Sequence, residues 1–179
     1  FNFSKKKVLE FTKKICATNS DKIFHNATYD VGWLAKEGIT VNGRIIDTMI
    51  VAPLIDENQY WYTLNALGRE YINEGKTEAD LNAAAEEWGL DPKAEMWRLP
   101  SAYVGTYATQ DAALTLKLWN HFKVLLEEQN LWNIFDLEID VLPVVLAMKQ
   151  KGVRVDIERA ESLKVELVKR EKQIIQKIK

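Results

Sequence analysis

The sequence predicts a helix-rich α/β fold. Residues 22–25 form a short apolar run that is typical of a strand, and helical spacing follows at once over residues 29–36. Polar side chains stand at the junction between the two segments, which is where α/β proteins gather their sites. Longer helical patterns occupy much of the remaining sequence, so most of the chain is expected to be helical.

Capping and turn residues mark the ends of the early elements. Ser4 is suited to cap a first helix, along which apolar residues repeat at steps of three and four. Gly38 is a typical C-cap for the helix that follows the strand. Asn42-Gly43 indicates a hairpin or a tight turn. Asp47 precedes another apolar run and is expected to cap the next helix.

Helical patterns continue to the end of the sequence. Further helices are expected at residues 63–71, 79–88 and 101–130. A new apolar helical face begins at Trp132 and contains Pro143, which indicates a kink or a nearby helix start. Residues 152–156 are interpreted as a short strand-like link, and a charged amphipathic helix is expected from there to Lys179.

Composition excludes several classes of protein. Apolar residues make up 47% and charged residues 28% of the sequence, as in ordinary globular proteins. The net charge of −2 gives no basic footprint, which weighs modestly against a pure DNA-binding module. Cys16 is the only cysteine, so no intrachain disulfide can form and a reducing cytoplasm is the natural compartment. No apolar run approaches the ~20 residues that a membrane span needs.

Tyr107 and Asp111 are the residues whose spacing points most directly to chemistry. They are four residues apart within the long helical run, so both side chains project from one face. The carboxylate can ligate a hard cation and the phenol can hold an attacking water, which suits metal-dependent hydrolysis. The alternative is a solvated acid beside a half-buried ring, whose hydroxyl would still need a polar partner.

A second candidate piece follows the predicted strand. It reads His25-Asn26-Ala-Thr-Tyr-Asp30 and opens a helical pattern. Carboxylates that converge on one place from distant parts of a chain are what a two-metal site needs. Asp30 and Asp111 are therefore expected to meet.

In this order, the two pieces resemble the DEDDy 3′–5′ exonuclease domain attached to family A DNA polymerases, particularly the phage and prophage type. Asn26-Ala-Thr-Tyr-Asp30 matches that family's second exonuclease motif, and Tyr107-Ala-Thr-Gln-Asp111 matches its third. Residues 46–50 and 97–100 are also similar to segments of those polymerases. The resemblance covers nearly the whole chain.

The resemblance implies a division of the chain. Residues 1–135 would be a partial RNase H-like exonuclease domain, with few strands because the family's leading strands are missing. Residues 136–179 would be the start of the polymerase domain, with a linking segment and a first thumb helix. The implied partners are DNA (a single-stranded 3′ end or a primer–template) and the rest of the polymerase chain, with no membrane. The implied location is the cytoplasm of a bacterial or phage-infected cell.

The resemblance also implies a mechanism, in which a proofreading site removes nucleotides from a DNA 3′ end with two Mg²⁺ ions, for which Mn²⁺ can substitute. Asp30, Tyr107 and Asp111 would be catalytic. Asp30 and Asp111 would bind the metals, and Tyr107 would orient the attacking water. Asn26 and His25 would contact the nucleic acid.

One departure from the family concerns its first motif, an Asp-x-Glu pair on a leading strand. Residues 1–25 contain no such pair, so the chain is expected to be truncated before it. Two carboxylates cannot hold two Mg²⁺ ions without further ligands, so the chain alone is expected to have little exonuclease activity. The Asp-x-Glu patterns that begin at Asp136 and Asp156 are rejected, because they follow the third motif and fall in helical segments.

Two other functions stay open at this stage. An RNA exonuclease of the RNase D type shares the same motifs, and the fold could also serve as a non-catalytic scaffold that guides DNA. The linking segment at residues 152–156 and the thumb-like last helix favour the polymerase. The two matched motifs argue against a scaffold, which has no chemical need for these residues.

Overall fold

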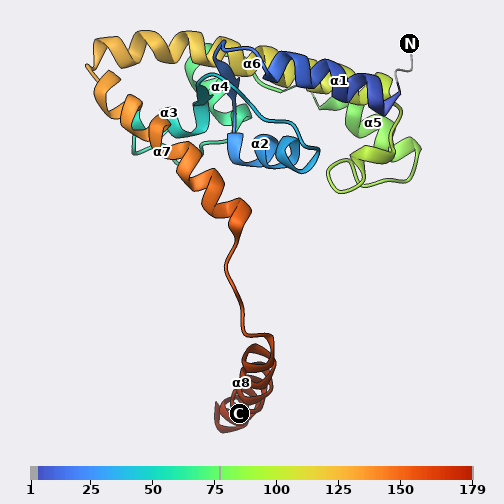
Figure 1. Cartoon of the computed structure of the whole chain (residues 1–179). Helices are drawn as coiled ribbons and strands as arrows, with labels where there is room; N and C mark the ends of the chain where they lie inside the picture. The colour runs from blue at the N-terminus through green and yellow to red at the C-terminus, as the bar shows by residue number, and fades with distance from the viewer. Residues whose placement is uncertain (1–3, 77, 179) are drawn as a thin grey trace. The chain divides into compact units, whose positions relative to one another are not determined.

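The computed structural model describes residues 4–76 and 78–178. The chain divides into two compact units, Phe1–Leu146 and Ala147–Lys179, and the division falls inside helix α7 (Trp132–Lys151) (Figure 1). Helices predominate over strands in the described residues, which confirms the predicted helix-rich α/β class. None of the helices in these ranges has the length and apolar character that a membrane crossing requires. The functional boundary expected at residue 135 stays a prediction.

The first unit opens with the predicted helix, strand and helix. Helix α1 (Lys5–Cys16) begins after Ser4, whose side chain makes no capping hydrogen bond. Strand β1 (Lys22–Phe24) leads into helix α2 (Ala27–Lys36). Just beyond α2, Gly38 has a φ of 72°, a left-handed conformation that glycine adopts without strain.

The sheet described by the structure consists of two parallel strands. Strand β2 (Ile45–Asp47) pairs with β1 so that Phe24 lies opposite Asp47. No hairpin forms at Asn42-Gly43. Gly43 instead makes a tight turn with a φ of 79°, and a Cβ there would lie 2.3 Å from the Ser20 carbonyl oxygen. Parallel strands need a crossover connection, and α2 supplies it.

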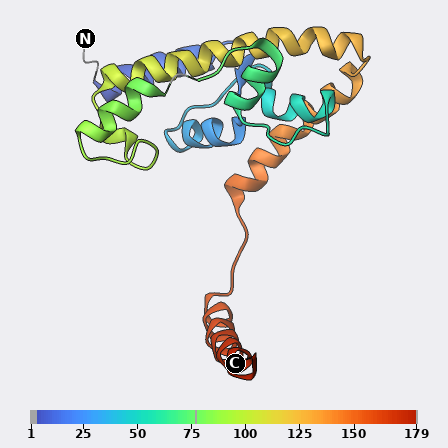
Figure 2. The same ribbon diagram turned by 180° about the vertical axis from the view of Figure 1, so that it is seen from behind.

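The next helices occupy the positions that periodicity predicted. They are α3 (Thr48–Ile55), α4 (Leu64–Ile72), α5 (Ala79–Glu87) and α6 (Ser101–Glu128), with the short 3₁₀ turn η1 (Met96–Arg98) before α6. Pro53 lies inside α3, near its end. The long helix α6 packs against α3, α4, α5 and β1, and Figure 2 shows it from behind.

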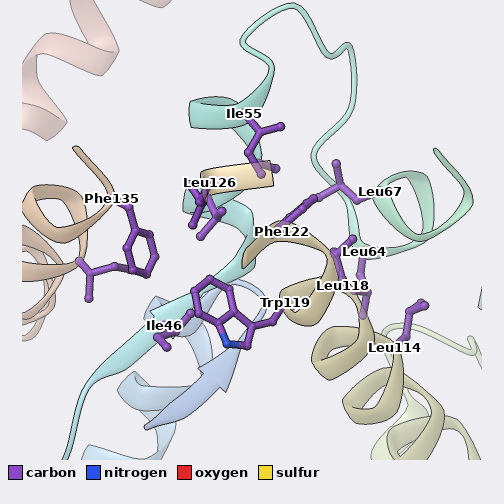
Figure 3. Packing of buried hydrophobic residues seen from close by; sticks show 13 residues of the cluster. Ile46, Ile55, Leu64, Leu67, Leu114, Leu118, Trp119, Phe122, Leu126 and Phe135 are labelled. Carbon is purple, nitrogen blue, oxygen red and sulfur yellow. The ribbon is translucent and has the colours of Figure 1, made fainter. Parts of the chain in front are cut away.

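The main hydrophobic core lies along the C-terminal half of α6. Trp119 stacks on Phe135 of α7 with ring centroids 5.4 Å apart, and Phe122 meets Tyr71 of α4 edge to face at 5.1 Å. The labelled side chains in Figure 3 come from β2, α3, α4, α6 and α7 and converge on this place. Since this half of α6 is fixed by the core, its N-terminal half is held as a rigid extension.

The last helices follow the predicted pattern, and the segment between them differs from expectation. Helix α7 runs through Pro143 without a new start, so the kink, the other predicted alternative, stays a prediction. Residues 152–156 have no regular structure, so the strand-like link was wrong. Helix α8 (Ile157–Ile178) follows, and Asp156 accepts a hydrogen bond from the backbone N–H of Arg159 at its first turn. The predicted end of this helix at Lys179 lies outside the described residues. The rejected Asp-x-Glu pattern at Asp136 lies within α7, and the one at Asp156 spans the start of α8.

Asp47 joins the sheet to two helices. Its side chain caps α3 by accepting a hydrogen bond from the Met49 N–H at 2.9 Å, which confirms the predicted cap. It also accepts from the backbone N–H groups of Asn26 at 2.9 Å and Ala27 at 2.7 Å, at the start of α2. Asp47 is only 2% exposed. A buried carboxylate is costly unless it is fully hydrogen-bonded, and two helix N-termini supply both the donors and favourable dipoles.

Asp47→Asn is expected to lower the free energy of unfolding by about 2 kcal/mol, because an amide has one acceptor oxygen where the carboxylate has two. Urea denaturation measures the loss. Asp91→Asn is the matched control, because Asp91 also accepts two backbone N–H bonds but does so in an exposed loop. Equal losses in the two variants would show that burial is not what makes Asp47 important.

Candidate functional site

A cavity of about 620 Å³ lies where β1, α2, α4 and α6 meet. Its lining includes His25, Asp30, Tyr107 and Asp111, so residues more than 70 positions apart in the sequence face one space. The predicted convergence of the two motif segments is therefore confirmed. Most of the remaining wall is apolar, which limits hydration around the polar groups.

Tyr107 and Asp111 share one face of α6, as their spacing predicts. The Tyr107 ring packs on a small cluster formed by α5 and Leu99, and its hydroxyl faces the cavity side. The polar partner that a half-buried phenol needs is the ammonium group of Lys76, which donates to the hydroxyl oxygen at 3.0 Å.

The two carboxylate oxygens of Asp111 differ in their hydrogen bonding. Its Oδ2 accepts a hydrogen bond from Lys76 Nζ at 2.6 Å. Its Oδ1 is buried and has no hydrogen-bond partner among the described residues. A buried carboxylate oxygen without a donor is rare because it costs free energy, and such atoms mark places where an ion or water belongs.

Lys76 was not predicted to belong to the site. Burial acts to lower the pKa of its ammonium group, but the hydrogen bonds with Asp111 and Tyr107 outweigh that effect and raise the pKa above its usual value. Lys76 therefore carries a full positive charge. Sequence reasoning missed it because it stands in a polar linker, 35 residues before Asp111, where no periodicity signals a site.

Asp30 lies in the first turn of α2 and reaches the cavity while remaining in contact with solvent. Reduced hydration beside the protein surface raises the pKa of its carboxyl, and the negative charge of Asp47 raises it further. No cation is paired with Asp30 among the ion pairs of the described residues. A positive charge bound near Asp30 would lower the pKa and hold the carboxylate ionised.

Asn26 has a structural role that the motif alone does not reveal. It has φ 71° and ψ 56°, the left-handed conformation that asparagine tolerates better than most residues. This conformation lets the chain turn from β1 into α2. Its side-chain oxygen accepts a hydrogen bond from the Thr28 hydroxyl at 3.0 Å. Asn26 is not among the residues that line the cavity, so its predicted contact with nucleic acid stays a prediction.

His25 lies at the inner wall of the cavity. Its Nδ1 is 2.9 Å from the Thr48 hydroxyl, and the hydroxyl also donates to the Phe24 carbonyl oxygen. Burial lowers the pKa of the imidazole below its ordinary value of 6.5, against opposing effects of Asp47 and the Tyr62 backbone. His25 is therefore neutral near pH 7. Its contact with nucleic acid stays a prediction.

The oxygen donors in the cavity suit a hard divalent cation. Asp111 Oδ1 is buried without a partner, and Asp30 lines the same space. Carboxylate oxygens are what Mg²⁺ prefers, together with water and substrate phosphates. Within residues 4–76 and 78–178, no group of three or more His, Cys, Asp or Glu side chains converges as a complete metal site. The described residues thus fit part of a ligand set.

The described residues form a helix-rich α/β domain in which acidic and phenolic side chains gather at one cavity. A solved structure described as the "apo form of the nuclease" has the same fold, with a TM-score of 0.63 and 21% identity, covering 82% of this chain and 67% of that one. The sequence model of the 3′-5′ exonuclease family matches residues 2–127. The chain therefore belongs to the 3′-5′ exonuclease domain family of family A DNA polymerases.

Its relatives include polymerases of phages and bacteria. It is 36% identical over 145 residues to the DNA-directed DNA polymerase of Pseudomonas phage M6, covering 80% of this chain and 22% of the relative. It is 24% identical over 134 residues to DNA polymerase I of Treponema pallidum, covering 73% of this chain and 13% of that protein. The chain thus spans less than a quarter of the length of these two relatives.

Stability should depend on pH through His25. Because its pKa is lower in the folded chain than the ordinary 6.5, the unfolded chain binds a proton more readily as the pH falls through that value. The melting temperature should therefore drop between about pH 7.5 and about pH 5.5, and His25→Gln should reduce that drop. His121→Gln changes the only other histidine and is the control. A drop of the same size in His25→Gln as in the parent chain would contradict this assignment.

Proposed function

We propose that this chain carries the proofreading 3′–5′ exonuclease region of a family A DNA polymerase. The observation that carries the proposal is the cavity, whose lining includes Tyr107, Asp30 and Asp111. One oxygen of Asp111 is buried and has no hydrogen-bond partner among the described residues. The reaction is hydrolysis of the terminal phosphodiester at a DNA 3′ end. The family membership and the polymerase relatives support the choice of DNA.

Each residue has a role in the proposed reaction. Asp111 and Asp30 hold divalent cations through their carboxylate oxygens, Mg²⁺ first and Mn²⁺ as a substitute. Ions held there would supply charge stabilisation for the oxygens that exchange at the phosphorus atom. Tyr107 accepts or donates a hydrogen bond that orients the attacking water. His25 and Asn26 contact the nucleic-acid strand from the end of β1.

Further ligands are needed to complete the site. The described residues bring two carboxylates to the cavity, whereas near-octahedral Mg²⁺ pairs need more oxygen ligands. We propose that an Asp-x-Glu pair of the kind found in the family's first motif supplies them. The 179-residue chain alone should then have little exonuclease activity.

The cytoplasmic location stays a prediction.

The test is digestion of a 5′-labelled single-stranded DNA oligonucleotide with Mg²⁺ or Mn²⁺. The chain is compared with a chimera in which the Asp-x-Glu segment of the Pseudomonas phage M6 polymerase is fused to its N-terminus. The chimera should shorten the oligonucleotide from its 3′ end, and Asp111→Asn in the chimera should reduce the rate by at least about a hundredfold, since it removes a metal ligand.

Each alternative predicts a different result. Faster digestion of RNA than of DNA would favour an RNase D-type enzyme. DNA binding without metal dependence, and no digestion by the chimera, would favour a scaffold. Digestion by the unextended chain that Asp111→Asn abolishes would show that the printed residues suffice. If Asp111→Asn left the digestion rate of the chimera unchanged, the proposed role of Asp111 in the site would be refuted.

An exposed aromatic pair a few residues before the cavity-lining Leu64 supports a single-stranded substrate. Tyr60 and Trp61 are 84% and 62% exposed, and their rings meet edge to face at 4.9 Å. Their loop is ordered by the Asp56 carboxylate, which accepts from the Asn58 N–H, and it leads into Leu64, which lines the cavity. Exposed aromatic rings stack on bases without regard to sequence.

Tyr60→Ala with Trp61→Ala should weaken binding of a fluorescent single-stranded oligonucleotide about tenfold, since stacking on one base is worth about 1–3 kcal/mol. Fluorescence anisotropy in EDTA measures affinity while digestion is prevented. Trp88→Ala removes another exposed indole, at the end of α5, and should leave the affinity unchanged. An equal loss of oligonucleotide affinity with Trp88→Ala would show that any exposed aromatic residue has this effect, and it would contradict a specific role for Tyr60 and Trp61.

A further inference from the structure

The ammonium group of Lys76 binds the carboxylate of Asp111, the residue proposed as a metal ligand, at a place where a metal cation would otherwise bind. Lys76 Nζ lies 2.6 Å from Asp111 Oδ2, 3.0 Å from the Tyr107 hydroxyl oxygen and 5.0 Å from the centre of the Tyr107 ring. The two side chains of this ion pair are 17% and 26% exposed. It is the least exposed ion pair of the part of the chain that the structure describes.

The backbone around Lys76 is fixed by contacts of its own. The Lys76 N–H donates to the Asn65 side-chain oxygen of α4 at 2.9 Å, and the Glu74 N–H donates to the Gly68 carbonyl at 3.0 Å. The Glu74 carboxylate pairs with Lys117 of α6 at 2.7 Å. Since these contacts do not involve the Lys76 side chain, the flexible four-carbon stem can leave Asp111 while the backbone stays in place.

A divalent cation and this ammonium group cannot share Asp111 at low energy. Two positive charges within a few ångströms repel strongly where neighbouring protein atoms exclude water. Lys76 pairs with Oδ2 and offsets the charge of the metal-free carboxylate, while Oδ1 has no donor among the described residues. Removing the ammonium group would leave the carboxylate charge without a paired cation.

We propose that Lys76 is a built-in counter-ion that a divalent cation must displace from Asp111, so that Lys76 sets the metal affinity of the site. The proposal rests on the proposed function in one respect, namely that Asp111 is a metal ligand. Because the same ammonium group also binds the Tyr107 hydroxyl, its departure frees the phenol in the same movement. Metal loading and release of the hydroxyl for water are thereby linked.

The test is Mn²⁺ binding to the 179-residue chain, measured by titration calorimetry without nucleic acid. Lys76→Met keeps the length of the side chain and removes its charge. It should bind Mn²⁺ about tenfold more tightly than the parent chain, which corresponds to about 1.4 kcal/mol. Lys76→Arg keeps the charge and should bind Mn²⁺ as weakly as the parent.

Two further variants separate the specific effect from a general one. Lys117→Met removes one positive charge from the neighbouring ion pair with Glu74. It should change the Mn²⁺ affinity less than twofold, because solvent screens the charge of an exposed lysine. Lys76→Met combined with Asp111→Asn should lose the gain, because the carboxylate that binds the ion is gone. Circular dichroism shows whether each variant is folded. If Lys76→Met does not fold, Lys76→Gln takes its place.

Unchanged or weaker Mn²⁺ binding by the folded, uncharged variant would overturn the proposal, as would an absence of Mn²⁺ binding in every variant. A gain shared by Lys117→Met would also overturn it. The exonuclease proposal is tested separately by the chimera. If digestion depends on Asp111 but Lys76→Met does not change the Mn²⁺ affinity, only the counter-ion proposal is rejected. If Lys76→Met binds Mn²⁺ more tightly but the chimera digests nothing, the counter-ion proposal stands and the exonuclease proposal is rejected.

Discussion

The carboxylate of Asp47 fixes the geometry on which the candidate site depends. It ends β2 and accepts hydrogen bonds from the first N–H groups of α3 and α2, although it has almost no contact with water. A buried charge of this kind is tolerated only while all its bonds are made, so α2 has one allowed direction relative to the sheet. That direction carries Asp30 from the end of β1 to the cavity that α6 borders.

The two halves of helix α6 have different roles in the structure. Its C-terminal half buries Trp119 and Phe122 in the main core, while its N-terminal half presents Tyr107 and Asp111 to the cavity. A single helix transmits position along its axis because its backbone hydrogen bonds are continuous. The core therefore holds the acid and the phenol rigidly, which suits a reaction that needs fixed ligand geometry.

One lysine offsets the charge of one of the two cavity carboxylates in the metal-free chain. Asp111 is paired with Lys76, whereas the pKa of the Asp30 carboxyl is raised by burial and by the charge of Asp47. One oxygen of Asp111 has no donor among the described residues, and in the proposed site this carboxylate would be the one that attracts a metal ion. In the proposed exonuclease site, the same carboxylate would have to be both tolerated in the metal-free fold and available as a metal ligand.

The sequence by itself determined the helices, because their apolar faces repeat with the helical period. It also determined the two motif segments, because residue types and short spacings are local properties. The parallel pairing of β1 with β2, the second helix that Asp47 caps and the place of Lys76 were decided only by the tertiary structure. Each of these joins residues at least 20 positions apart, and no local pattern encodes which distant groups will meet. Such pairs are selected by packing and by the need to satisfy buried polar atoms.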